Sequence, residues 1–354
     1  MQCDRASTTD SLQKAIRFLL NSRRRVAGGP NTPLHENDSP TYWSDFCVFG
    51  RFSDEWVTGY TAVALAGSII PEARDAAYRA WRFLTADRPR KRPGLGYNRE
   101  TPHDADSTQW GCRLAQLLGL TTDEWFQQGI ELLVGSRTGR QPQSSVVPAA
   151  FLRPDGGIAT YFVTAFPLMD GHRAREDAVR GWTRSHVCVT AATAWMRDVL
   201  AFGDLIGFLA REQAPQGYWN SYWWADREYA TAHAVESLSR HGLQPEMVER
   251  GVRWLSECAG EISAFRLALR LIGISITGSD RAEGLLRRLL ALQLGDGSWD
   301  ASARLRIPPL DLSNPEIRWN WDEGSDGFGG IVIDRARVFT TATGVRALTS
   351  CLVR

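Results

Sequence analysis

Two aspartates spaced two residues apart are the clearest candidates for chemistry in this sequence. Asp104 and Asp106 stand in the segment His103-Asp104-Ala105-Asp106-Ser107-Thr108, where a helix rich in small residues is expected to begin. The free N–H groups at a helix N-terminus attract carboxylates. Two carboxyl groups in one desolvated site cannot both ionise cheaply, so one of them would hold a proton near neutral pH. The pair is therefore a candidate for acid catalysis, although aspartates also commonly cap helices without further function.

Aromatic side chains are the second kind of candidate, because each desolvated aromatic face stabilises a cation by about 0.5 to 2 kcal/mol. A carbocation needs such a dry wall, since water or an anion would quench it. The chain has 14 tryptophans, most of which must be structural because aromatic residues also pack cores efficiently. The residues predicted to line a substrate cavity are Trp56, Trp110, Trp223, Trp224, Tyr229 and Phe339, together with the small side chain of Cys188.

Two arginines, Arg227 and Arg337, are candidates for holding an anionic headgroup such as a carboxylate or diphosphate. Salt bridges are an equally good interpretation, because the acidic residues Asp226, Glu228 and Asp334 are close by in the sequence. The basic run at residues 88–93 is expected to be a solvated loop.

The elements that must position these residues form an internal repeat. Six amphipathic segments carry apolar residues at helical spacing and begin at Ser11, Ala73, Asp123, Ala201, Glu246 and Arg281. Six segments richer in small and apolar residues alternate with them and begin at Trp56, Asp106, Cys188, Tyr229, Ala264 and Phe339. Five of these share a threonine at one equivalent position, namely Thr58, Thr108, Thr190, Thr231 and Thr341. Because the second class is less amphipathic, we expect its helices to be buried on most sides.

Strict alternation of the two classes predicts an all-α protein, an (α/α)6 toroid of six outer and six inner helices forming one domain over residues 1–354. A generic helical bundle is the alternative. The longest connections, residues 28–54, 136–185 and 300–337, all run from an outer to an inner helix, so they should share one rim and order a site there. In this frame Asp54, His186, Arg227 and Arg337 occupy the position of Asp104, and Trp56, Cys188, Tyr229 and Phe339 that of Asp106.

Composition excludes several classes of protein. The formal net charge is +1, which gives no bulk field for nucleic acid or an acidic membrane surface. No apolar run approaches the roughly 20 residues needed to span a bilayer, and the N-terminus lacks the pattern of a signal peptide. Six scattered cysteines without a CxxC pair favour a reducing compartment. We expect a cytoplasmic protein without cofactors; its oligomeric state is left open.

Two segments resemble the QW repeat of squalene–hopene and oxidosqualene cyclases. They run from Gln213 to Trp219 and from Gln293 to Trp299, each with the pattern Gln-x-x-x-Gly-x-Trp, and a degenerate copy at Asp155-Gly156-Gly157-Ile158 lacks the Trp. The chain is thereby similar to the terpenoid cyclase and protein prenyltransferase superfamily, as a single-barrel member. The resemblance implies that the Gln caps an inner helix while the Trp stacks on it, tying neighbouring hairpins together.

The segment from Asp104 to Ser107 resembles the DxDD motif of class II cyclases, in which the third residue protonates an alkene or epoxide. The resemblance implies that Asp106 is this acid and Asp104 a supporting carboxylate, and that His186 assists by hydrogen-bonding the Asp106 region. Ser107 stands where the family usually has Asp, and could donate a hydrogen bond instead. No DDxxD cluster for magnesium is present. The implied activity is acid-initiated cyclisation of a modest terpenoid or another small apolar or amphiphilic substrate.

Two other functions stay open. Protein prenyltransferases bind zinc through Asp-x-Cys and Tyr-His-Thr, and the matching stretches here are His186-Val187-Cys188 and Tyr229-Ala230-Thr231. A rebuilt zinc site would need His186, Cys188 and His233, since zinc accepts nitrogen and sulfur ligands. A non-catalytic toroid that binds an apolar ligand or a protein is the third possibility. Our prediction is a class II-like cyclase without a metal site.

Overall fold

The computed structural model describes residues 5–25, 39–86, 94–135, 150–163, 176–199, 204–258, 262–276 and 281–353. The basic run at residues 88–93 lies outside the described residues. Within them, helices dominate and strands are short. None of the helices seen in these ranges is long and apolar enough to cross a bilayer.

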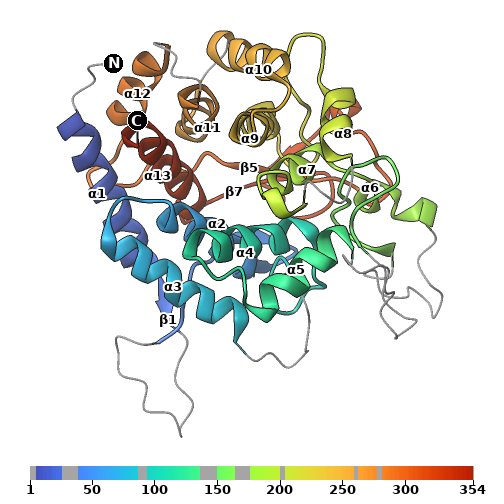
Figure 1. Ribbon diagram of the computed structural model, residues 1–354, viewed down its shortest axis with the longest axis horizontal. Helices are drawn as coiled ribbons and strands as arrows, with labels where there is room; N and C mark the ends of the chain where they lie inside the picture. The colour runs from blue at the N-terminus through green and yellow to red at the C-terminus, as the bar shows by residue number, and fades with distance from the viewer. Residues whose placement is uncertain are drawn as a thin grey trace, which may run out of the picture.

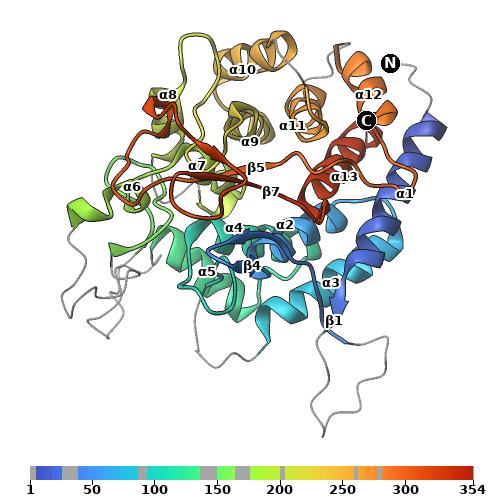
Figure 2. The same cartoon turned by 180° about the vertical axis from the view of Figure 1, so that it is seen from behind.

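Six helices form a closed inner ring, as the repeat predicts (Figures 1 and 2). Each contacts the next in the order α2, α4, α7, α9, α11, α13, and α13 returns to α2. All twelve residues of α2 are buried, which explains why these segments are rich in small and apolar residues rather than amphipathic. The inner helices are α2 (Glu55–Ala66), α4 (Ala105–Leu118), α7 (Val187–Thr193), α9 (Arg227–Arg240), α11 (Ala264–Ser275) and α13 (Val338–Leu352).

Six outer helices surround the ring, and each packs against at least one inner helix, while α3 and α10 each contact two. In α10 the buried residues Met247, Val248, Gly251 and Leu255 form a single stripe, as expected for a helix with one face in solvent. The outer helices are α1 (Arg5–Ser22), α3 (Pro71–Thr85), α5 (Glu124–Val134), α8 (Leu205–Glu212), α10 (Pro245–Glu257) and α12 (Arg281–Ala291). Because α1 packs against α13, the first and last helices close the toroid, and the start of α1 lies beside the end of α13 (Figure 1). The predicted (α/α)6 fold is confirmed.

Four of the five repeated threonines fasten a connection to its inner helix, whereas before α13 the neighbouring Thr340 takes the place of Thr341 and bonds Ser302 and Ala303. The hydroxyl of Thr58 accepts a hydrogen bond from the backbone N–H of Trp43 at 2.9 Å, and that of Thr231 accepts one from Trp219 at 3.0 Å. In the same way, the Thr108 hydroxyl accepts the backbone N–H of Leu95, and the Thr190 hydroxyl accepts that of Ile158. A buried hydroxyl is costly unless it is hydrogen-bonded, so the repeat keeps a residue that both fits the small space and bonds the backbone.

The two QW segments bind outer helices, which corrects the expectation that their glutamines cap inner ones. The Gln213 side chain donates to the Met247 carbonyl of α10 at 3.0 Å, and that of Gln293 to the Ser11 carbonyl of α1 at 2.9 Å. The Trp219 indole donates to the Leu209 carbonyl of α8 at 2.7 Å. Each QW segment therefore joins one outer helix to the next around the ring.

The glycines of these segments are required by their backbone and by close packing. Gly217 and Gly297 have φ of +99° and +89°, a region that side chains disfavour. A Cβ atom on either would lie 2.4 Å from a carbonyl oxygen, that of Arg250 in α10 or Lys14 in α1. The glycine of the QW pattern is therefore required because neighbouring hairpins are in close contact at this position.

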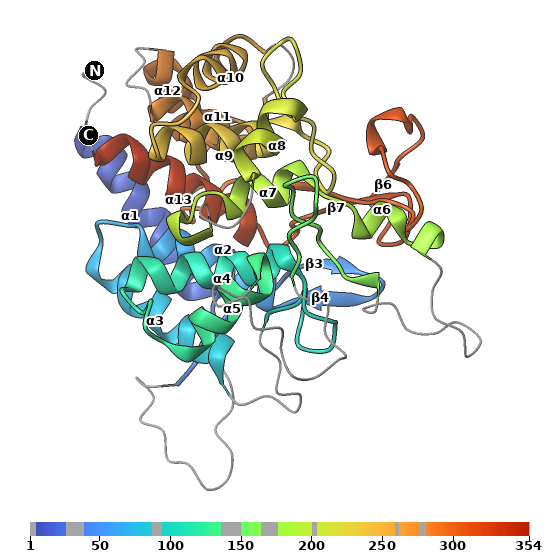
Figure 3. The same cartoon turned by 45° about the vertical axis from the view of Figure 1, so that its right-hand side comes forward.

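The three long connections meet on one rim, as predicted, and carry the strands (Figure 3). The first contains β1 (Arg24–Arg25), β2 (Thr41–Tyr42) and the hairpin of β3 (Asp45–Val48) and β4 (Arg51–Ser53). The second carries the short helix α6 (Arg180–Thr183). The third forms a sheet in which β7 (Gly330–Ile333) pairs antiparallel with β5 (Arg304–Ile307) and parallel with β6 (Asp322–Glu323).

Hydrogen bonds tie the first and third connections together. The Asp45 carboxylate accepts backbone N–H groups from Ala336 at 3.1 Å and Val338 at 3.0 Å. At the tip of the β3–β4 hairpin, the N–H of Phe49 donates to the Asp326 carbonyl at 2.8 Å. Segments nearly 300 residues apart in the sequence therefore form a single rim over the N-terminal ends of the inner helices.

Candidate active site

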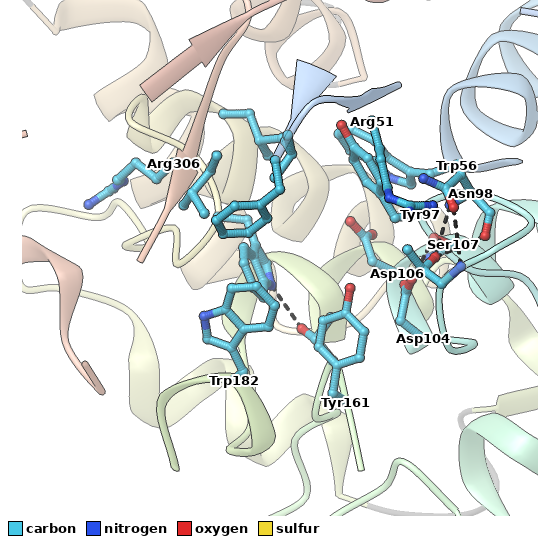
Figure 4. A pocket seen from close by; sticks show the side chains of 17 residues that line it. Arg51, Trp56, Tyr97, Asn98, Asp104, Asp106, Ser107, Tyr161, Trp182 and Arg306 are labelled. Atoms are coloured by element: carbon cyan, nitrogen blue, oxygen red, sulfur yellow. Dashed lines mark hydrogen bonds between the residues drawn. The ribbon is translucent and has the colours of Figure 1, made fainter. Parts of the chain in front are cut away.

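A cavity of about 190 Å³ opens at this rim (Figure 4). Its walls come from the β3–β4 hairpin, residues 97–101, the first turns of α2 and α4, residues 160–161, α6, Trp223 and β5. Most of the lining is apolar or aromatic, including Val48, Phe49, Leu305 and Ile307. Both predicted acid residues, Asp104 and Asp106, face this cavity. The rim connections and inner-helix N-termini thus enclose the carboxyl groups in a largely apolar space.

Asp106 lies in the first turn of α4 and does not cap the helix. Its Oδ1 accepts a hydrogen bond from the Gln109 side chain at 3.2 Å. Burial raises the pKa of Asp106 to about 7, and the Gln109 amide and the indoles of Trp110 and Trp56 only partly offset this effect. The groups that favour its ionised form are all uncharged, so the carboxyl group keeps its proton in a substantial fraction of molecules at neutral pH.

Asp104 is the N-cap of α4, so for this residue the capping interpretation is correct. Its Oδ1 accepts the Ser107 backbone N–H at 2.7 Å, and its Oδ2 accepts the Ser107 hydroxyl at 2.8 Å. Burial nevertheless raises the pKa of Asp104 well above its usual value, and the charge of Asp106 adds to the rise. Ser107, at the position where the resemblance leads one to expect Asp, therefore supplies a hydrogen-bond donor to Asp104.

Glu55 is a third buried carboxyl group that sequence reasoning missed. It lies in the first residue of α2, and its Oε2 accepts the Gly96 backbone N–H at 2.8 Å. Its charge also contributes to the raised pKa of Asp104. No local pattern marked it, because it comes from a different inner helix and approaches Asp104 only when the ring closes.

His186 does not contact Asp106, which corrects the expectation drawn from the family. Its Nε2 bonds to the Gly181 carbonyl at 2.8 Å, so this nitrogen carries the hydrogen, and Nδ1 accepts the Thr160 hydroxyl at 2.6 Å. Thr160 in turn accepts the Trp223 indole N–H at 2.8 Å. Burial lowers the pKa of His186 to about 3, which keeps the ring neutral. Because Thr160 and Trp223 line the cavity, His186 positions this part of the wall.

Two of the predicted aromatic residues, Trp56 and Trp223, line the cavity. Sequence reasoning missed four others, Phe49, Tyr97, Tyr161 and Trp182. Burial raises the pKa of Tyr161 well above its usual value, and the nearby charges of Asp104 and Asp106 raise it further. Tyr97, Tyr161 and Trp182 all lie in rim connections, where no helical periodicity could place them.

Four predicted lining residues, Trp110, Trp224, Tyr229 and Phe339, are packed inside the ring and are not part of the cavity wall. Trp224 stacks on Tyr229 at a centroid distance of 4.4 Å and on Phe339 at 5.1 Å. Phe339 stacks on Tyr60 at 3.9 Å. Cys188 is likewise buried and absent from the wall. Aromatic packing therefore fills the centre of the toroid, which confines the cavity to the rim.

Neither arginine predicted to hold a headgroup lies at the cavity. Arg227 pairs with Glu316 at 2.7 Å, and Arg337 with Asp296 at 2.9 Å. The salt-bridge interpretation is thus correct in kind, although the partners differ from the sequence neighbours considered. The arginines that do line the cavity are Arg51 and Arg306, both from rim strands.

The residues of the zinc alternative do not form a ligand set. Both ring nitrogens of His186 are bonded to Thr160 and Gly181. His233 lies against Tyr229 and Trp110, and its Nδ1 is 3.2 Å from Glu236. Among the described residues, no group of three or more His, Cys, Asp or Glu side chains is arranged to hold a metal ion.

Solved structures resemble this fold over almost the whole chain, whereas no family model and no curated protein matches the sequence. The type II terpene cyclase MstE from Scytonema, as an aspartate-to-asparagine variant with its substrate geranylgeranyl dihydroxybenzoate, is 28% identical with a TM-score of 0.82. That alignment covers 99% of this chain and 98% of MstE. An aspartate-to-alanine variant of MstE with its product merosterolic acid A is also 28% identical, with the same coverage and a TM-score of 0.81.

A protein from Actinoplanes is similar to the same degree, at 28% identity and a TM-score of 0.80, with 97% of this chain and 99% of that chain covered. The likeness thus extends over whole chains and includes a cyclase of established type. Together with the toroidal fold, it shows that the chain belongs to the terpenoid cyclase superfamily and is an enzyme of the class II terpene cyclase type.

Proposed function

We propose that Asp106 starts the reaction by donating its proton to the terminal double bond of a prenyl chain bound in the cavity. One observation carries this proposal: a carboxyl group with a pKa near 7 faces an apolar, aromatic cavity without a cationic partner among the groups that set its pKa. A general acid works best when its pKa lies near the operating pH.

The proton of Asp106 forms a new C–H bond at one carbon of the alkene, and the other carbon becomes a cation. The next double bond attacks this cation, so each ring closure forms one C–C bond and moves the charge along the chain. Loss of a proton from the last cation restores a double bond. The product is an isomer of the substrate, and solvent returns a proton to Asp106.

The surrounding residues suit these steps. Asp104 and Ser107 form a hydrogen-bonded pair beside the acid, which holds the first turn of α4 in place. The faces of Trp56, Trp182 and Trp223 provide walls that stabilise a cation without quenching it. Because MstE acts on a geranylgeranyl dihydroxybenzoate, we infer a prenylated small molecule as substrate here.

We further propose that the whole chain works as one domain in a reducing, cytoplasmic setting. The contact of α1 with α13 closes the ring, so that neither end of the repeat is left uncovered. The cysteines described in the structure, Cys47, Cys112, Cys188, Cys258 and Cys351, are free thiols.

Product analysis after reaction in D₂O tests the proposal. The Asp106 carboxyl group exchanges its proton with solvent, so each product molecule should gain one deuterium at the carbon of the former terminal alkene. Suitable substrates are geranylgeranyl-substituted benzoic acids and prenyl diphosphates. Cyclic product without deuterium at that carbon, or unchanged turnover by Asp106→Asn, would contradict the proposal.

A further inference from the structure

The cavity is polarised along its length. Asp104 and Asp106 occupy the end formed by the inner helices, and both carboxyl groups are enclosed by protein. Apolar and aromatic side chains such as Phe49, Trp56 and Ile307 make up much of the remaining wall. Arg51 lines the outer end, where its side chain is 60% exposed. A ligand that matches this sequence of surfaces has an apolar chain and an anionic head.

Among the described residues, two arginines line the cavity wall, and Arg51 is the more accessible to a ligand: its side chain is 60% exposed and that of Arg306 is 4% exposed. Arg306 is engaged by protein groups: its Nε donates to the Trp224 carbonyl at 2.7 Å, and its Nη2 reaches Glu316 at 2.7 Å. Figure 4 shows Arg306 extending away from the acid residues, whereas Arg51 lies beside Tyr97 and Asn98. Arg306 therefore stabilises the rim through its Nε and Nη2 donors.

Arg51 has an ion-pair partner that a ligand can replace. It contacts Glu100, whose side chain is 71% exposed. Exposed ion pairs contribute only about 0 to 1 kcal/mol, because water and salt screen both charges. A carboxylate or phosphate delivered by a bound substrate would meet the guanidinium at the edge of an apolar cavity, where the interaction is stronger than in water.

We propose that Arg51 binds the anionic headgroup of the substrate at the cavity mouth and thereby sends the apolar chain inward, terminal alkene first, toward Asp106. The inference deepens the proposed function and depends on it for the identity of the inner end. It assigns the enzyme to prenylated acids, with a carboxylate or phosphate head, and disfavours neutral prenyl alcohols. Arg51 is thus a specificity-determining residue rather than a source of protons.

Binding to the full-length Asp106→Asn protein, which lacks the proposed proton donor, provides the direct test. Four probes share a geranylgeranyl chain and differ in the head: a free benzoic acid, its methyl ester, a diphosphate and the neutral alcohol. Arg51→Gln should weaken binding of an anionic probe about tenfold, the loss of one charge-assisted hydrogen bond. The ester and the alcohol should bind equally to both proteins. If Arg51→Gln weakens binding of the benzoic acid alone, the natural headgroup is a carboxylate. If it weakens binding of the diphosphate alone, the headgroup is a phosphate, and if it weakens both, Arg51 accepts either anion.

Arg99 supplies a matched control, because it is another rim arginine that lies outside the cavity wall. It pairs with Asp54 at 3.1 Å and packs its guanidinium over the Phe83 ring at 4.6 Å. Arg99→Gln makes the same change of charge, and should alter binding less than about twofold. Glu100→Gln should strengthen binding of the anionic probes, because it removes the competing carboxylate, and Arg51→Lys should restore part of the affinity.

The inference is overturned if Arg51→Gln weakens the acid and its ester equally, if it weakens neither, or if none of the probes binds. Steady-state KM values of the otherwise unaltered enzyme should repeat the pattern, with kcat little changed. The deuterium experiment decides the role of Asp106 separately. If the product carries deuterium but Arg51→Gln does not change binding of the anionic probes, the acid mechanism is retained and only the headgroup assignment is rejected.

Discussion

Two buried carboxyl groups inside the ring, Asp106 of α4 and Glu236 of α9, have opposite surroundings. Burial alone would raise both pKa values. At Glu236 the charges of Arg346 and Arg113 outweigh burial and hold the pKa well below its usual range. The Arg346 guanidinium lies 2.8 Å from this carboxylate and that of Arg113 lies 3.3 Å from it. At Asp106 no such cation contributes, and the pKa rises to about 7.

The difference indicates that Glu236 is a structural anion, whereas Asp106 is suited to proton transfer. Glu236 is an anion at every ordinary pH, and its partners come from α4 and α13, so the ion cluster joins three inner helices. The aromatic contacts of Trp110 with His233 at 5.5 Å and with Tyr60 at 4.7 Å lie next to the cluster in the ring. Asp106 faces a cavity instead, so its proton is available for transfer.

Removing the acid should have the largest effect. Asp106→Asn keeps the shape and removes the transferable proton, so cyclisation should fall by about 10³-fold or more, toward the upper range for general-acid catalysis. Stability should not fall. Relative to the wild type it should rise between about pH 4 and pH 7 and stay raised above pH 7, because over this range the unfolded carboxyl group ionises while the folded one keeps its proton. Product formation and thermal unfolding at pH 8 check the two halves. A variant that loses both activity and fold would show that Asp106 is structural, like Glu236.

Removing the structural charge should damage stability rather than chemistry. Glu236→Gln leaves Arg113 and Arg346 buried without their anion, and breaking such a pair costs about 3 to 5 kcal/mol. Denaturant titration measures this loss. The control is Glu249→Gln, which removes an exposed pair with Arg253 and should cost no more than about 1 kcal/mol. Equal effects of the two substitutions would mean that the ion cluster does not hold the ring together.

The pH dependence should follow Asp106 alone. Catalysis needs its protonated form, and the folded-state pKa is about 7. The value of kcat/KM should therefore be level below pH 7 and fall about tenfold for each further pH unit above it, because one proton is lost. Glu236, with its pKa well below the usual range, contributes no change there. A rate that rises with pH through 7 would assign an essential base instead.

The smallest expected change concerns the support of the acid. Ser107→Ala removes the hydroxyl donor to Asp104 but keeps the backbone N–H bond that caps α4. One neutral hydrogen bond is worth about 0.5 to 1.5 kcal/mol, so kcat should fall about two- to tenfold with little change in KM. Thr9→Ala, which removes an exposed hydroxyl bonded within α1, is the control and should leave kcat unchanged.

Much of the fold followed from the sequence because the repeat is local. Gly59 meets Trp110 of the next inner helix, Gly111 meets Trp125 of an outer helix, and shared threonines such as Thr58 and Thr231 bond the preceding connection. Such constraints recur at most hairpins, so twelve similar segments reveal one architecture. The cap formed by Asp104 also agrees with its position at the start of an inner helix.

The lining of the cavity was harder to predict because it depends on the rim. Equivalence along inner helices placed Tyr229 and Phe339 at the wall, but the Trp224 ring stacks on both and buries them. The same reasoning placed Arg227 and Arg337 at the cavity mouth. In the structure Arg227 instead pairs with Glu316, and Arg337 pairs with Asp296. Residues in irregular connections follow no helical or strand periodicity, so the direction in which their side chains point cannot be derived from the sequence.

The sequence by itself determined the ring, the alternation of its helices and the aspartate pair at the start of α4, because each depends on spacing within one hairpin. Only the tertiary structure decided which aromatic faces remain open, that Glu55 approaches Asp104, and that Arg51 rather than Arg227 or Arg337 stands at the mouth. These features depend on how three long connections fold against one another over the ring. Contacts between segments so far apart in the chain leave no local pattern in it.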